Sequence, residues 1–294
     1  MAKRERDEVT GTDMTGHDWD GIKELDTPLP RWWLWTFYAT VVWALAYTIA
    51  YPAWPMLTGA TPGVLGYSSR RDIAAEMTAA KAAQGELLGK IAALPLDDIR
   101  KDPALLQFAT AAGRAAFRIN CIQCHGTGAA GGKGYPNLND DDWIWGGTLD
   151  QIHTTLQHGV RFLADADTRQ PPQMPAFGTD GVLKPGQIND VADYVLKLSG
   201  NEHDAAAAER AVQIYADNCA ACHGKDGEGN REFGSPRLAD AIWLYGSGKA
   251  AIAAQIARPR QGVMPAWNTR LDETTIKQLA VYVHSLGGGD ASTP

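Results

Sequence analysis

The sequence predicts an all-α protein in which one transmembrane helix precedes two repeated helical domains. Three observations lead to this prediction: an uncharged apolar stretch near the N-terminus, a short cysteine motif that occurs twice, and matching helical patterns around the two copies. The 294 residues are enough for two or three domains. The net charge of −7 and the lack of any Lys or Arg run indicate that nucleic acid is not a partner.

The apolar stretch runs from Trp32 to Tyr51 and contains no charged residue. A helix of twenty residues is about 30 Å long, which matches the hydrocarbon core of a bilayer. Tryptophans cluster at its start, and Trp54 follows its end between two prolines, as is typical of the aromatic belts at membrane interfaces. A cleaved signal peptide is disfavoured because the stretch starts late and no small-residue cleavage site follows. We expect a retained anchor over 32–54 after an N-terminal segment, 1–31.

The cysteine motif has the form Cys-x-x-Cys-His and uses all four cysteines of the chain, as Cys121-Ile122-Gln123-Cys124-His125 and Cys219-Ala220-Ala221-Cys222-His223. This motif is the attachment signature of c-type haem, in which two thioethers hold the porphyrin and the histidine ligates iron. Two disulfides, a thioredoxin-like redox site or a zinc site are the alternatives. Zinc would need four ligands to converge from distant motifs, and a redox pair would not need the histidine twice. We therefore expect two covalently bound haem c groups.

The motifs also orient the anchor, because haem is attached covalently outside the bacterial cytoplasm. Both motifs lie C-terminal to the single span, so the N-terminus is expected in the cytoplasm and the haem domains in the periplasm. The charges that flank the span favour a cytoplasmic N-terminus only weakly.

The two motifs lie in an internal repeat whose parts follow one order: a helix, the haem motif, a Trp-aromatic-Gly element, a Met-Pro pair and a final helix. The repeat predicts cytochrome c-like domains at 104–200 and 201–286. A periplasmic linker with a helix near Arg70 to Lys90 is expected over 55–103. The glycine-rich end, 287–294, is expected to be a disordered tail.

The Met-Pro pairs, Met174-Pro175 and Met264-Pro265, occupy matching positions of the two repeats. A thioether is a soft ligand that suits electron-transfer haems, and a His/Met pair raises the reduction potential. We predict that both methionines ligate iron. Each could serve the haem of its own repeat, or the two could cross to the neighbouring haem.

The remaining histidines are expected at the surface or at helix ends; they are His17, His153, His158, His203 and His284. The acidic run Asp140-Asp141-Asp142 is either a docking surface for a basic cytochrome or, more often for such a run, a solvated turn.

The N-terminal pattern carries a more specific resemblance. The segment Asp20-Gly21-Ile22-Lys23-Glu24-Leu25-Asp26-Thr27-Pro28-Leu29-Pro30-Arg31-Trp32-Trp33, continuing through Tyr51-Pro52-Ala53-Trp54-Pro55 to Leu65-Gly66-Tyr67-Ser68-Ser69-Arg70, resembles the anchor of CcoP, also called FixP. This family is the dihaem subunit, subunit III, of cbb3-type cytochrome c oxidases, and the resemblance covers nearly the whole chain. It implies haem attachment at Cys121, Cys124, Cys219 and Cys222, axial His125 and His223, and Met174 and Met264 as the remaining ligands. It favours the crossed pairing, His125 with Met264 and His223 with Met174.

The resemblance implies an electron relay in the bacterial inner (cytoplasmic) membrane. A donor cytochrome c would reduce one haem, and electrons would pass to a CcoO-like monohaem subunit and a CcoN-like haem–copper subunit, where oxygen is reduced to water and protons are pumped. A small CcoQ-like subunit and membrane lipid are further expected partners. This chain would hold no oxygen-reducing site, because it has one span and no histidine cluster for copper.

Three other functions fit parts of the pattern. A free-standing membrane-anchored dihaem carrier would share the repeats but not the anchor motif. A dihaem peroxidase would need an open haem site, against which the two Met-Pro pairs argue. A gas-sensing haem protein would bind a gas in place of a weak methionine ligand.

Overall fold

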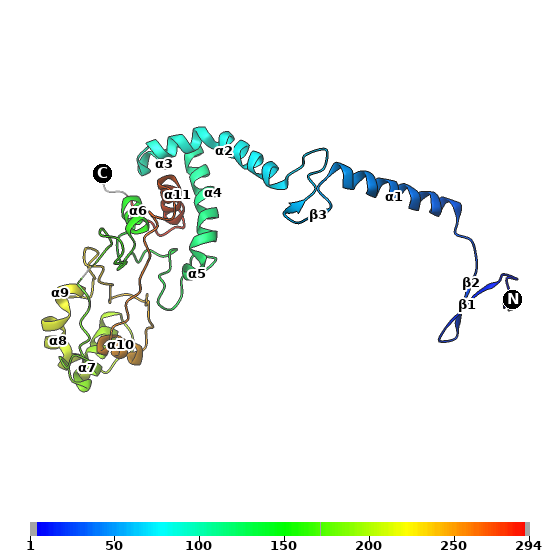
Figure 1. The fold of residues 1–294 in the computed structure, drawn as a ribbon. Coiled ribbons are helices and arrows are strands. Elements are labelled where there is room, and N and C mark those ends of the chain that lie inside the picture. The colour runs from blue at the N-terminus through cyan, green and yellow to red at the C-terminus, as the bar shows by residue number, and fades with distance from the viewer. Residues whose placement is uncertain (1–4, 171, 292–294) are drawn as a thin grey trace. The chain divides into compact units, whose positions relative to one another are not determined.

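The computed structural model describes residues 5–170 and 172–291, and the chain forms two compact units, Met1–Ala82 and Ala83–Pro294. Figure 1 shows the elements of both units along the chain.

The first unit begins with a small hairpin that the all-α prediction did not include. Strands β1 (Met14–Trp19) and β2 (Ile22–Leu25) pair in antiparallel fashion. Their two-residue turn, Asp20-Gly21, has positive φ at both positions, 52° and 91°, which is the backbone of a type I′ turn. A second, two-residue pairing joins β3 (Pro55–Met56) to β4 (Gly59–Ala60).

Helix α1 (Arg31–Ala50) corresponds to the predicted span and buries none of its residues within the structure. It is the one helix among the described residues that is long and apolar enough to cross a membrane. A core helix of a soluble protein would be mostly buried, so the exposed apolar surface of α1 supports a membrane anchor. The predicted linker helix is α2 (Ser69–Ala93).

The second unit is helical and contains two hydrophobic cores. Lobe 1 surrounds the first motif and consists of α3 (Leu96–Lys101), α4 (Pro103–Asn120), α5 (Ile122–His125), α6 (Leu149–His158) and α11 (Glu273–His284). Lobe 2 surrounds the second motif and consists of α7 (Pro185–Leu198), α8 (Ala205–Asn218), α9 (Ala220–His223) and α10 (Lys249–Ala257).

The final helices of the two repeats are exchanged between the lobes. Helix α11 closes the second repeat but packs on α4 and α6 in lobe 1, while α7 closes the first repeat but packs on α8 and α10 in lobe 2. Figure 1 shows α11 beside α4 and α7 beside α8. The packing therefore crosses the boundary that the sequence repeat places at residue 200.

A glycine permits a close contact between α4 and α11. A Cβ atom on Gly113 would lie 2.1 Å from the backbone oxygen of Gln278, so only glycine lets the two backbones approach this far. Lys277 adds polar contacts, because its Nζ donates to the carbonyls of Ala92 and Leu94 at 2.9 Å.

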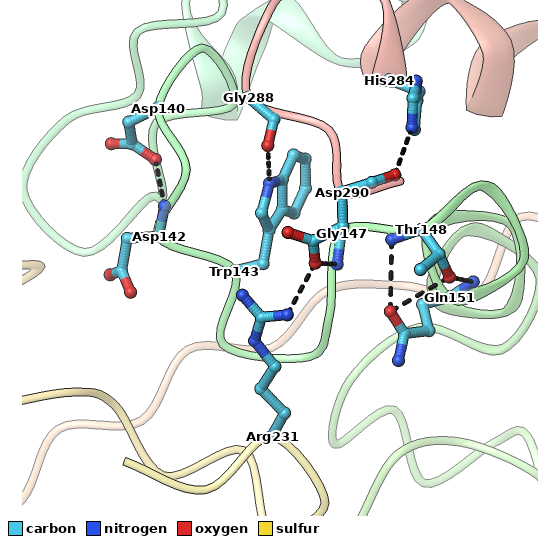
Figure 2. Close-up of polar contacts among 10 residues, drawn as sticks. All are labelled: Asp140, Asp142, Trp143, Gly147, Thr148, Gln151, Arg231, His284, Gly288 and Asp290. Atoms are coloured by element: carbon cyan, nitrogen blue, oxygen red, sulfur yellow. Dashed lines mark hydrogen bonds and ion pairs between the residues drawn. The ribbon is translucent and has the colours of Figure 1, made fainter. Parts of the chain in front are cut away.

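The glycine-rich end was predicted to be disordered over 287–294. The structure describes it through residue 291, and residues 292–294 lie outside the described part. The indole Nε1 of Trp143 donates to the Gly288 carbonyl at 2.6 Å, and Asp290 accepts from the amide of Gly147 at 2.9 Å (Figure 2). The same carboxylate pairs with Arg231 at 2.6 Å. The tail thus connects the loop after the first motif with the loop after the second.

Candidate haem-binding sites

The eight predicted site residues gather in two cavities of four. The cavity of lobe 1 is lined by Cys121, Cys124, His125 and Met264, and that of lobe 2 by Cys219, Cys222, His223 and Met174. Each cavity takes its methionine from the other repeat, so the crossed arrangement is the one that the fold brings together. The exchange of α7 and α11 accounts for it, because each methionine precedes an exchanged helix.

One helical turn aligns each attachment motif on its cavity. Cys121 ends α4, with its amide bonded to the Phe117 carbonyl at 2.8 Å, and the amides of Cys124 and His125 both return to the Cys121 carbonyl. Cys219 ends α8 in the same way, above Tyr215. Phe117 and Tyr215 each lie four residues before a motif, and both are buried.

The fold disfavours the zinc alternative, because the two cysteine pairs line different cavities and do not converge on one site. Burial raises the pKa of both Cys121 and Cys219 to about 11. All four cysteines are unbridged in the structure, as thioether formation requires.

The histidine of each motif is held in the tautomer that leaves Nε2 free. The Nδ1 atom of His125 lies 3.1 Å from the Pro136 carbonyl, and that of His223 lies 3.0 Å from the Pro236 carbonyl. A carbonyl can only accept, so Nδ1 carries the proton and Nε2 presents its lone pair. Burial also lowers the pKa of both rings, which favours the neutral form that binds a metal.

Met264 is fastened to the end of α6 by its backbone. Its amide donates to the Val160 carbonyl at 3.0 Å and its carbonyl accepts from the Val160 amide at 2.9 Å. Gly159 has φ +68°, and a Cβ there would come within 2.3 Å of the Met264 carbonyl oxygen. The loop therefore enters lobe 1 only because this position is glycine.

The loop after Met174 is fastened to α10 in the corresponding way. The amides of Gly178 and Thr179 both donate to the carbonyl of Ala257, the last residue of α10, at 3.2 Å. The Thr179 hydroxyl donates to the same oxygen at 3.0 Å. Each methionine loop is thus tied to the helix end of the opposite repeat.

The residues present fit a c-type haem. Two cysteines, one histidine and one methionine line each cavity, and the walls are largely apolar side chains such as Phe117 and Leu279 in lobe 1. In the lobe 2 cavity, the buried Nε1 of Trp243 has no hydrogen-bond acceptor among the described residues, whereas its counterpart Trp143 donates to the tail. A buried N–H without an acceptor is costly, and a haem propionate is a suitable acceptor.

Four of the five remaining histidines contact polar partners away from the cavities. His153 pairs with Glu273 at 2.8 Å, His158 with Asp165 at 3.1 Å, and His203 and His284 face backbone carbonyls. His17 lies in the N-terminal hairpin. None of the five lines either cavity.

The acidic run is only partly solvated. Asp142 is half-buried, and its pKa is raised to about 6 by burial and then by the nearby carboxylates of Asp240 and Asp140. Asp240 comes from the corresponding loop of the second repeat, so the run lies against the other half of the unit rather than forming a free acidic face.

The sequence interpretation missed the residues that separate the cavities. Trp145, Arg161, Tyr245 and Arg260 line both cavities at once. Trp145 and Tyr245 are the aromatic residues that precede the glycine in the repeated Trp-aromatic-Gly element, so the repeat made them visible. Nothing in the sequence indicated that the two arginines lie beside them.

Comparison with known families and proteins gives one consistent result. A family model described as the N-terminal domain of cytochrome oxidase-cbb3, FixP, matches residues 11–58. A second model, described as cytochrome c oxidase, cbb3-type, subunit III, matches residues 108–195 and again 206–283.

Full-length relatives agree with the family models. The cbb3-type cytochrome c oxidase subunit FixP of Sinorhizobium medicae is 55% identical over 97% of both chains. FixP of a Bradyrhizobium species is 56% identical over 97% of this chain and 98% of its own. Subunit CcoP of Cereibacter sphaeroides is 54% identical over 94% of this chain and 95% of its own.

Proposed function

This chain belongs to the FixP/CcoP family, subunit III of cbb3-type cytochrome c oxidases, and on that premise we propose the path by which electrons cross it. It is an electron-transfer subunit of the oxidase, and its two cytochrome c domains carry two covalently bound haem c groups. When bound, each haem supplies an iron that takes up and releases one electron.

The residues that would hold the two irons follow from the cavities. His125 and Met264 would hold the iron in lobe 1, and His223 and Met174 would hold the iron in lobe 2. The observation that carries this proposal is that each cavity combines a Cys-x-x-Cys-His motif with the methionine of the other repeat. Sites closed by His and Met suit electron transfer and leave no position for a substrate such as peroxide.

The path begins at a donor cytochrome c and ends outside this chain. With both haems bound, the two lobes would pass electrons to a CcoO-like monohaem subunit and then to a CcoN-like haem–copper subunit, where oxygen would be reduced to water and protons pumped. A small CcoQ-like subunit completes the complex. Helix α1 anchors the chain in the inner membrane, with its N-terminal segment in the cytoplasm and both lobes in the periplasm.

Purification in mild detergent tests the proposed partners. The chain should co-purify with a multi-span haem–copper subunit and a monohaem cytochrome c, and a redox titration should resolve its two haems as one-electron centres. Purification of a dihaem chain alone, with no haem–copper subunit, would instead identify a free-standing carrier. Rapid peroxide turnover or a stable five-coordinate haem would identify a peroxidase.

Orientation is tested by fusing alkaline phosphatase, which is active only in the periplasm, after residue 294 or before residue 5. The C-terminal fusion should be active and the N-terminal fusion inactive. The reverse pattern would contradict the proposed topology.

A further inference from the structure

The wall between the two haem cavities is built from matching parts of both repeats. Trp145 and Tyr245, which occupy the same position of the repeated element, each line both cavities. Arg161 does the same, and its Nε donates to the Gly262 carbonyl at 2.7 Å. The Arg161 side chain is therefore accessible from both cavities.

The two aromatic residues fix this wall by inserting into opposite lobes. A Cβ on Gly234 would lie 2.1 Å from the Trp145 ring, and one on Gly134 would lie 3.4 Å from the Tyr245 ring. The Gly134 amide also donates to the Leu244 carbonyl at 2.8 Å. Each glycine lies two residues before the proline whose carbonyl holds a proximal histidine. The wall is thus tied to both iron-binding loops.

The charge of Arg161 has no counterion in the described part of the chain. The side chain is half-buried, no carboxylate lies within ion-pair distance of it, and Nε makes its one hydrogen bond there. Burial lowers its pKa, as expected for a cation drawn from water without an anion beside it. Guanidinium is the side chain best suited to bind carboxylates in two-point fashion, and a half-buried one without a partner is unfavourable.

We propose that Arg161 binds propionate carboxylates of both haems, and so is a positioning residue that holds the two cofactors with their propionate edges turned towards one wall. This inference rests on the proposed occupancy of both cavities by haem. Propionates are the anionic groups that a haem brings, and Arg161 faces both cavities from between them. The second arginine of the wall, Arg260, stacks on Tyr245 at 4.9 Å but is exposed, so its charge is more strongly screened.

The shared position has a measurable consequence. Ferric haem carries one more positive charge than ferrous haem, so a nearby guanidinium disfavours oxidation. Removing the charge in Arg161→Gln should lower the midpoint potentials of both haems. The reduction equilibrium of each haem should change by on the order of tenfold, which corresponds to ~59 mV for one electron. Arg161→Lys should keep both potentials near those of the wild type, and Arg260→Gln should shift them less than Arg161→Gln.

The test is a redox titration of the detergent-solubilised full-length chain, with haem content measured beforehand. Arg270→Gln is the matched control, because Arg270 also stacks on an aromatic ring, that of Trp267 at 5.6 Å, but is exposed and lines neither cavity. A shift confined to one haem, no shift at all, or an equal shift in Arg270→Gln would overturn the inference.

Haem content separates this inference from the proposed function. Fewer than two haems in the wild-type chain would overturn the function itself, whereas two haems with unmoved potentials in Arg161→Gln would overturn only the role of Arg161. If Arg161→Gln failed to retain haem, infrared difference spectra of the wild type and Arg161→Lys would decide. Haem labelled at the propionates should then show carboxylate bands that differ between these two proteins, and identical bands would contradict the proposal.

Discussion

Val160 and Met264 exchange two backbone hydrogen bonds, of 2.9 and 3.0 Å, although they belong to different repeats and lie 104 positions apart in the sequence. The bonds hold the methionine of the second repeat at the cavity of the first motif. A main-chain contact of this kind does not depend on the side chain at 264. Replacing the methionine should therefore remove an iron ligand without releasing the loop.

We predict that Met264→Ala alters the haem on Cys121 and Cys124, and Met174→Ala the haem on the second motif. Each substitution should abolish the Met–iron charge-transfer band of its haem and lower that haem's midpoint potential by ~59 mV or more, a tenfold change in the reduction equilibrium. The assignment is made in a chain that keeps only the first haem, with Cys219 and Cys222 changed to Ser.

In that single-haem chain, Met264→Ala should remove the band and Met174→Ala should leave it, so each variant is the control for the other. The opposite result would mean that each methionine serves the haem of its own repeat.

The residue pattern alone predicts eight site residues but does not decide which methionine belongs to which motif; only the family resemblance favoured the crossed pairing. The reason is symmetry. The haem motif is contiguous, so one turn of helix places its three residues whatever the rest of the chain does. The helices α4 and α8 that precede the motifs, and α7 and α11 that end the repeats, carry similar apolar stripes. Own-repeat and exchanged packing therefore bury equivalent surfaces, and apolar periodicity does not distinguish them.

Other features were hidden for local reasons. The Asp20-Gly21 turn was readable as a hairpin signal, but the short strands around it are exposed and lack a clear apolar alternation. The glycines of 287–289 indicate disorder when read as composition. In the fold, a Cβ on Gly288 would overlap the Asp140 carbonyl, so this glycine permits close packing.

Gly113→Ala should destabilise the protein although alanine is the better helix former. The added Cβ would meet the backbone of α11, and overpacking of this kind costs about 1–3 kcal/mol. Gly85→Ala is the matched control, since Gly85 lies in α2 and a Cβ added there would meet no atom within 4 Å, so it should stabilise by about 0.5–1 kcal/mol. Thermal unfolding of the full chain measures both; equal effects of the two changes would contradict the close α4–α11 contact.

Asp290→Asn should loosen the C-terminal tail by a small amount. The substitution removes a partly solvent-accessible ion pair with Arg231, worth about 0.2–1 kcal/mol and weaker at high salt. Truncation after Leu286 should cost more, because it also leaves the Trp143 N–H without its acceptor, a loss of about 1–3 kcal/mol. Denaturant unfolding at low and high salt measures both.

Asp217→Asn, at an exposed carboxylate on α8, is the control for charge removal and should change little. Stability that is the same in the truncated and intact chains would show that the contacts in Figure 2 do not hold the tail in solution.

The half-buried carboxylate of Asp142 should make stability depend on pH in the direction opposite to an ordinary ion-paired acid. Its pKa rises from 3.8 to about 6 in the folded chain, through burial and then the charges of Asp240 and Asp140, against the smaller opposing effect of Arg237 and Arg231. Between these two pH values the folded chain binds more protons than the unfolded chain. The contribution of this group to stability therefore falls as pH rises from about 4 to 6, and the penalty stays constant above that.

Asp142→Asn removes this penalty, so the variant should be more stable than the wild type at pH 7.5 and nearly equal to it at pH 4. Asp141→Asn is the control. Asp141 is the exposed neighbour of Asp142, so this substitution should change the free energy of unfolding by the same amount at both pH values. Denaturant unfolding of the full chain at pH 4, 5, 6 and 7.5 provides the measurement. A difference between Asp142→Asn and wild type that stays constant across this range would mean that Asp142 titrates like a solvated carboxylate, and that the loops carrying Asp142 and Asp240 do not meet in solution.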